Sequence, residues 1–206
     1  IYGEYVRNNS WQLRQSTDLS DEPSDDIREW SGNLLVQKVL NHARAALEDS
    51  VPLLNISTKE YEPFIVQGDL STYYHHDMYH VIVDHTVSAL KKVKSYLDKD
   101  TVVSQRIIQV YENAIAAYQQ KGNQDAVILM TLNKLQEQNL NNSDQDAYLQ
   151  ALDQLIQANR GNETIVQAYI RKANILVNKR DNIAALKCSE EGIENYPKYK
   201  GLDELK

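Results

Sequence analysis

The sequence predicts an all-α protein in which antiparallel helical hairpins stack side by side. Apolar residues recur with a 3.6-residue period along most of the 206 residues, and the alternation typical of strands persists nowhere. Only seven Gly and four Pro interrupt the chain, which favours long helices over many short strands. Small residues in the last third recur 34 residues apart, a period typical of helical-hairpin repeats.

Composition narrows the classes of function. The formal net charge is -7, and the acidic residues are spread along the chain. Nucleic acids and anionic membranes are bound by clustered Lys and Arg, so neither is an expected partner. Cys188 is the only cysteine, which rules out an intrachain disulfide. No apolar run reaches the ~18 residues that span a bilayer, so this segment is not expected to insert into a membrane.

Residues 1–100 predict an N-terminal helical subdomain. We expect a helix over residues 1–15, a polar loop over 16–26 and a helix from Ile27 to about Glu48, which the region around Pro52 ends. A short element containing Tyr61 follows and stops at Gly68. Ser71 or Thr72 is then expected to cap a helix. Its predicted apolar stripe is Met78, Ile82, Thr86, Ala89, Val93 and Leu97.

Residues 101–206 predict a helical repeat region, separated from the first part by the polar run DKD at 98–100. The expected helices cover 103–120, 126–138, 145–159, 164–178 and 182–195. The run KGN at 121–123 predicts a turn, and NLNNSD at 139–144 predicts a loop with capping residues. The residues expected to face inward in the first two helices are Ile107, Tyr111, Ala114, Tyr118, Ile128, Leu132 and Leu135.

Within this region, Ala168 to Pro197 resembles a tetratricopeptide repeat. Tyr169 is the large residue of the first helix, and Ala185, Ser189 and Gly192 are small residues that let the second helix lie close to it. In the preceding segment only the second helix of a repeat fits this pattern, because the loop predicted at 139–144 interrupts the first helix of that repeat. The 34-residue recurrence pairs Ala151 with Ala185, Leu152 with Leu186 and Ala158 with Gly192. The resemblance implies a tetratricopeptide-like solenoid, with a generic helical bundle as the alternative. Polar side chains such as Lys172 and Asn174 would then either bind a partner on the concave face or simply be solvated.

A histidine-rich stretch supplies the weak metal candidates. His76, His80 and Asp84 stand four residues apart on one predicted helical stripe, and paired His residues at that spacing can hold zinc. Asp77 follows His76 where a zinc protease motif has Glu. We expect the stripe to be exposed, opposite the face of Met78, Ile82, Thr86 and Ala89, so an exposed His80–Asp84 pair is the favoured interpretation.

The remaining sequence motifs give no support for a catalytic or cofactor site. Cys188-Ser189-Glu190-Glu191 is similar to the run that forms an internal thioester, but Glu191 stands where the acyl-donating Gln is needed, so Cys188 is interpreted as a packing residue. No phosphate-binding loop, nucleophile elbow, dinucleotide fingerprint or Cys-x-x-Cys pair occurs. We therefore predict no catalytic residue and no cofactor. Asn-x-Ser/Thr sequons begin at Asn8, Asn55, Asn141 and Asn162.

Several motifs of the first hundred residues coincide with one known family. They are the run YGEYVRNNSWQLRQST at 2–17, DIREW at 26–30, the helix with His42, YEPFIVQG at 61–68 and MYHVI at 78–82. In order and spacing they resemble the helical N-terminal region of very large bacterial alpha-2-macroglobulin-like proteins, in which a degenerate helical-repeat region follows.

The resemblance implies a non-catalytic part of an envelope protein related to protease traps, located in the periplasm or on an outer-membrane lipoprotein. The segment is then a helical scaffold or docking surface, and its partner is another protein or other domains of the same polypeptide. The start at Ile1, in helix-like sequence, agrees with a piece of a longer protein. The alternatives are a stand-alone tetratricopeptide adaptor, a helical surface glycan-binding protein and, third, a metal hydrolase that uses the histidines.

Overall fold

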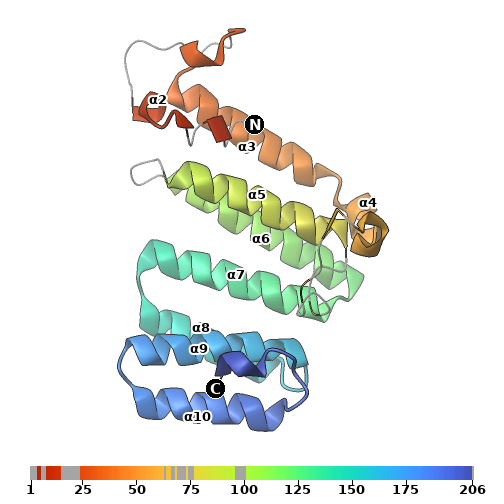
Figure 1. Cartoon of the computed structure of the whole chain (residues 1–206), viewed down its shortest axis with the longest axis vertical. Coiled ribbons are helices and arrows are strands. Elements are labelled where there is room, and N and C mark those ends of the chain that lie inside the picture. Colours follow the sequence, from red (N-terminus) through yellow and green to blue (C-terminus); the bar gives the residue numbers. More distant parts are fainter. Residues whose placement is uncertain are drawn as a thin grey trace. The chain divides into compact units, whose positions relative to one another are not determined.

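The computed structural model describes residues 4–5, 8–14, 24–62, 64–65, 68, 73, 77–95 and 101–205 (Figure 1). Every regular element among these residues is a helix, and an isolated bridge pairs Ser57 with Asp77. The all-α prediction is confirmed for this part of the chain. None of the described helices is both long and apolar enough to cross a membrane.

The chain forms two compact units. The first comprises residues 1–60 and 77–110, and the second comprises 61–76 and 111–206. The DKD run at which we predict a division lies outside the described residues, so a boundary at residue 100 stays a prediction.

In the first unit, helix α3 is held by packing on α5. The elements are α2 (Trp11–Arg14), η1 (Ile27–Glu29), α3 (Gly32–Glu48), α4 (Ser50–Asn55), η2 (Thr58–Tyr61), α5 (Met78–Lys94) and the first half of α6 (Thr101–Lys121). Leu35, Val39 and Leu40 of α3 are buried. The amide of Gln12 in α2 is fully buried and donates to the carbonyl oxygens of Trp30 (2.6 Å) and Ile27 (2.8 Å).

Three predicted boundaries in this unit are wrong. The helix expected from Ile27 starts only at Gly32, because the Ser31 side chain caps it by accepting from the Leu34 N–H at 3.0 Å. The predicted end of this helix at about Glu48 is confirmed. Pro52, however, does not end the helical region but lies in the first turn of α4, where a missing N–H costs nothing. Asp77, not Ser71 or Thr72, caps α5, since its carboxylate accepts from the His80 N–H at 3.0 Å.

The buried face of α5 is displaced by one residue from the prediction. Of the expected stripe, Thr86 and Val93 are buried, Met78, Ile82 and Ala89 are only half-buried, and Leu97 lies outside the described residues. The residues that α5 buries are Tyr79, His80, Val83, Thr86, Val87, Leu90 and Val93. Tyr79 and His80, whose rings are apolar and whose tips are polar, are buried on this face beside the aliphatic side chains Val83, Val87 and Leu90.

The second unit is a succession of helical hairpins. After the second half of α6 come α7 (Gln124–Asn142), α8 (Gln145–Ala158), η4 (Glu163–Ile165), α9 (Val166–Asn178), α10 (Asn182–Asn195) and η5 (Leu202–Leu205). The residues predicted to face inward are confirmed as buried, except that Leu135 is half-buried. The turn at 121–123 is confirmed too: Gly122 has φ of +73°, and Asn123 caps α7.

The loop predicted at 139–144 is wrong. Helix α7 continues through Asn142, and only Ser143 and Asp144 leave helical geometry: Ser143 is left-handed (φ 56°), and Asp144 caps α8 by accepting from the Ala147 N–H. The polar run is the exposed last turn of α7. The first helix of this hairpin is therefore uninterrupted, and α7 and α8 pack together.

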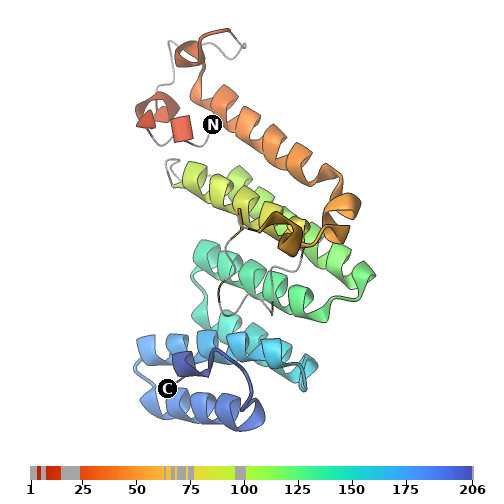
Figure 2. The same ribbon diagram turned by 45° about the vertical axis from the view of Figure 1, so that its right-hand side comes forward.

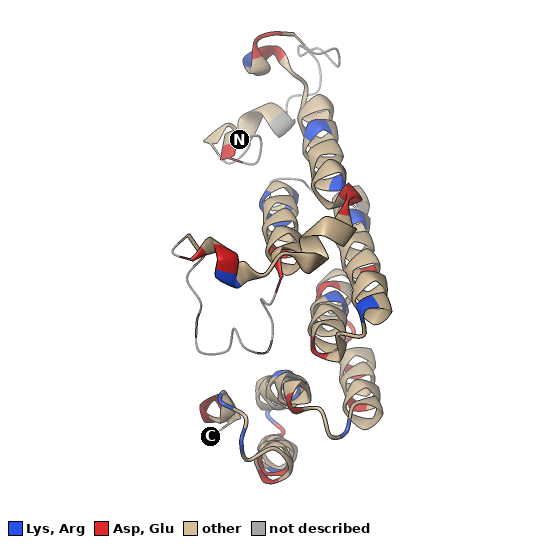
Figure 3. Cartoon of the chain, turned by 90° about the vertical axis from the view of Figure 1, so that its right-hand side faces the viewer, with Lys and Arg blue, Asp and Glu red and all other residues tan. Residues whose placement is uncertain are grey.

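Helices α8, α9 and α10 lie side by side in alternating directions (Figures 1 and 2). One apolar core joins them, and Leu152, Ile165, Val166 and Ala168 in it are fully buried. The charges of two neighbouring helices differ: α8 carries only acidic side chains and α9 only basic ones. Elsewhere, acidic and basic residues are spread over the described helices (Figure 3).

Candidate functional site

One of the histidine candidates lies in the core and not on the surface. His80 points into the core of the first unit and is 4% exposed, so the expectation of an exposed His80–Asp84 pair is wrong. Its Nε2 lies 3.7 Å from an Asp84 oxygen, and Asp84 is half-buried. His76 lies outside the described residues. Among the described residues no three His, Cys, Asp or Glu side chains are grouped so that they could hold a metal.

Cys188 is a packing residue, as predicted. It is buried in α10 with its Sγ 3.7 Å from the carbonyl oxygen of Tyr169. Burial raises the pKa of the Cys188 thiol to about 11. A thiol in this state is protonated at neutral pH and is a poor nucleophile. Nearby, burial and the Glu191 carboxylate, which accepts from the Tyr169 hydroxyl at 3.0 Å, raise the pKa of Tyr169.

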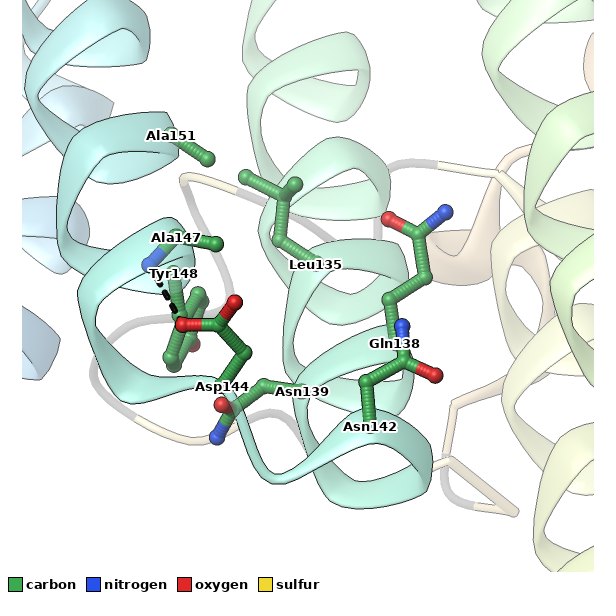
Figure 4. Close-up of a pocket in the computed structure, with 8 residues that line it drawn as sticks. All are labelled: Leu135, Gln138, Asn139, Asn142, Asp144, Ala147, Tyr148 and Ala151. Atoms are coloured by element: carbon green, nitrogen blue, oxygen red, sulfur yellow. Dashed lines mark hydrogen bonds between the residues drawn. The ribbon is translucent and has the colours of Figure 1, made fainter.

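A cavity of about 310 Å³ lies between α7 and α8 (Figure 4). Leu135, Ala147 and Ala151 form its apolar wall, and the polar residues that line it are Gln138, Asn139, Asn142, Asp144 and Tyr148. The Asn139 Oδ1 atom is buried and accepts no hydrogen bond. This cavity can accept a water or another small neutral donor, but its lining residues offer no nucleophile beside a base.

A polar network joins the start of α7 to the turn before α9. One oxygen of Asp125 accepts from the Asn162 amide at 2.8 Å and from the Thr164 hydroxyl at 3.0 Å, while Asn162 Oδ1 accepts from the Thr164 N–H. Thr164 is buried, so this network has to be complete to be stable. The sequon that begins at Asn162 therefore has its acceptor nitrogen, Asn162 Nδ2, in a hydrogen bond with Asp125.

Ion pairs and one arginine tie α9 to its neighbours. Lys172 pairs with Asp153 of α8, and Lys179 pairs with Asp146. Arg171 donates to the Leu132 carbonyl oxygen in α7 at 2.7 Å, with a second bond to Asn133 Oδ1 at 2.7 Å. Of the two polar residues predicted as candidates for a partner, Lys172 therefore has an intrachain role, and Asn174 is exposed.

The last hairpin has exposed apolar residues that the sequence analysis did not predict. The most exposed large apolar residues of α9 and α10 are Val177, Ile183 and Leu186, with 54%, 85% and 60% of their surfaces exposed. The sequence does contain a signal for them, because Ile183 and Leu186 stand three residues apart on α10, outside the face of small residues that contacts α9. Ile183 and Leu186 of α10, which we call the α10 outer patch, are the strongest candidate for a contact with a partner.

The chain has no counterpart in the comparisons with known proteins. No family model, no curated protein and no solved structure matches it.

Proposed function

We propose that this chain is a non-catalytic helical scaffold or protein-interaction segment of a larger macroglobulin-like protein of the bacterial envelope, and that its second unit is a tetratricopeptide-like solenoid. The proposal assigns no reaction to the segment. The bait, the β-domains and any thioester of such a protein would lie elsewhere in the polypeptide.

The contact between Gly192 and Tyr169 carries the repeat part of the proposal. In a tetratricopeptide hairpin a small residue of the second helix meets a large residue of the first. Here a Cβ added at Gly192 would lie 3.2 Å from Tyr169 Cβ, so α10 approaches α9 as closely as a glycine allows. The uninterrupted α7 supplies the first helix of the preceding hairpin, which the sequence alone had left missing.

The macroglobulin part rests on the motifs in residues 1–90. Two of them are structural in this chain. The Gln12 side chain of the first motif binds the carbonyl oxygens of Ile27 and Trp30, which belong to the DIREW motif. In the MYHVI motif, Tyr79 and His80 are core residues of α5. The motifs therefore encode packing within a helical unit, which agrees with a scaffold and supplies no reactive group.

The parent reading frame tests the proposal. Tandem β-sandwich domains downstream of Lys206, with a lipoprotein signal upstream of Ile1, are expected. A stop codon shortly after Lys206 would contradict the macroglobulin part and favour a stand-alone adaptor.

A biochemical experiment tests the scaffold role directly. Deleting residues 1–206 from the full-length parent should leave cleavage of its bait by a protease unchanged, while contacts with a partner protein or with the remaining domains are lost. Loss of bait cleavage with an otherwise folded parent would contradict a scaffold role.

A further inference from the structure

Helices α8 and α10 present equivalent faces. Ala151 of α8 lines the cavity against α7 (Figure 4), and 34 residues later the Ala185 side of α10, with Cys188 and Gly192, meets α9. Leu152 and Leu186 each follow one residue after these alanines, so they point in the same direction around their helices. Whatever covers Leu152 thus has a counterpart position beside Leu186.

The two leucines differ in burial. Leu152 is fully buried in the core that α8 shares with α9, whereas Leu186 and Ile183 are open to solvent. The chain that follows α10 does not cover them. It turns back so that Leu205 meets Gly192 and the Tyr199 hydroxyl accepts from Gln167 at 2.7 Å. In the part of the chain that the structure describes, Ile183 and Leu186 therefore remain exposed.

The charges beside the two leucines are opposite. Asp153 of α8 pairs with Lys172 of α9, and the residue 34 positions after Asp153 is Lys187. A helix that lies on α10 as α9 lies on α8 would bring its counterpart of Lys172 against Lys187. A lysine there would repel Lys187, whereas a carboxylate would pair with Lys187 as Asp153 pairs with Lys172.

We propose that the α10 outer patch binds one amphipathic helix of a separate partner protein, seated on α10 as α9 is seated on α8, with an acidic residue of the partner opposite Lys187. Ile183 and Leu186 supply the apolar contact, as in other recognition of a helix by an apolar surface. This goes beyond the scaffold role and does not depend on the macroglobulin resemblance.

The composition of the face makes the contact reversible. Where α8 buries Ile156, α10 carries the exposed Glu190, which tolerates water when the partner is absent. A permanently covered face would place an aliphatic residue there. A partner that leaves and returns fits this mixed surface.

A pair of peptides tests the proposal on the whole 206-residue chain. The first is a fluorescent peptide of residues 163–180 in which Lys172→Glu supplies the acid, and the second is the same peptide with Lys172 unchanged. In fluorescence polarisation the acidic peptide should bind saturably and about threefold more tightly than the unchanged one, the scale of one exposed ion pair. Lys187→Glu in the protein should reverse this order.

Matched variants fix the place of binding. Leu186→Glu should abolish binding of both peptides, while Val51→Glu, at an equally exposed apolar residue of α4, should leave it unchanged. Circular dichroism confirms that each variant is folded. The proposal is overturned if neither peptide binds, or if both bind equally well and Leu186→Glu has no effect. It is also overturned if sedimentation equilibrium shows self-association that Leu186→Glu abolishes, since a second copy of this chain is then the occupant.

Discussion

Gly192 of α10 lies against Tyr169 of α9 with no room for a side chain between them. A Cβ at Gly192 would stand 3.2 Å from Tyr169 Cβ and 2.9 Å from Leu205 Cδ1. The first of these atoms is fixed by the α9 backbone, whereas the second ends a side chain that can move. The glycine therefore sets the distance between the two helices of the last hairpin.

We expect Gly192→Ala to lower the free energy of unfolding by about 1 kcal/mol. Overpacking costs roughly 1–3 kcal/mol, and the better helix propensity of alanine returns about 1 kcal/mol. Urea denaturation of the two proteins measures the difference. In a Leu205→Ala background the loss should shrink, because the shorter of the two contacts is gone. Stabilisation in both backgrounds would mean that α10 moves outward without cost.

Removing the Thr164 hydroxyl should destabilise the second unit. Thr164→Val keeps the shape of a buried side chain but withdraws one donor from Asp125, with an expected cost of about 1 kcal/mol. Asp125→Ala should cost more, since Asn162 and Thr164 both lose their acceptor. Because all three share one network, the double variant Asp125→Ala/Thr164→Val should be less destabilised than the sum of the single ones. Additive losses would show that the two side chains act independently.

Cys188 should resist alkylation in the native protein. With a pKa raised from 9.0 to about 11, its thiolate fraction at pH 8 is about a hundredfold smaller than that of an unfolded thiol, and burial slows access further. Mass spectrometry of iodoacetamide-treated protein, with and without urea, measures both rates. Equal rates would contradict a buried thiol.

The same pKa shift predicts how stability depends on alkaline pH. The native state holds the Cys188 proton more tightly than the unfolded state, so this contribution is fully present below pH 9 and is lost as the pH rises toward about 11. Cys188→Ala should show a shallower decline of the unfolding free energy over that range. The raised pKa of Tyr169 acts in the same direction, so some decline remains in the variant.

Zinc should not bind one-to-one at micromolar concentration, because the imidazole of His80 lies in the core. Isothermal titration calorimetry of the intact chain measures this. His80→Ala should instead lower the free energy of unfolding by about 2 kcal/mol through the loss of buried contacts. Tight binding that disappears in both His76→Ala and His80→Ala would restore the metal interpretation.

The helices of the second unit were predictable because local signals and packing agree there. Asp144, Asn123 and Asp181 cap α8, α7 and α10, and each stands directly before an amphipathic run. The end of α7 was predicted wrongly because a run of polar residues is equally typical of a loop and of a solvent-exposed last helical turn. Only the tertiary position of Leu135 and Asn139 against α8 distinguishes the two.

The first unit was less predictable because aromatic and polar residues occupy its core. Tyr79 and His80 are buried in α5, whereas a stripe of aliphatic residues favours the neighbouring positions. The same ambiguity led to the prediction of an exposed His80, which is buried. The spacing of Ile183 and Leu186 indicates an apolar face on α10, but only the structure shows that this face is exposed.

The stacking of Tyr73 on Tyr199, with ring centroids 4.6 Å apart, has a consequence for synthesis of the chain. Tyr73 also accepts a hydrogen bond from the Lys200 N–H at 3.4 Å. Residue 73 leaves the ribosome long before residues 199 and 200, so this contact forms only when the last helical hairpin is complete. A fragment that starts at Tyr111 would contain α7 to α10 but lack the ring that stacks on Tyr199. Such a fragment should fray first at its C-terminal end.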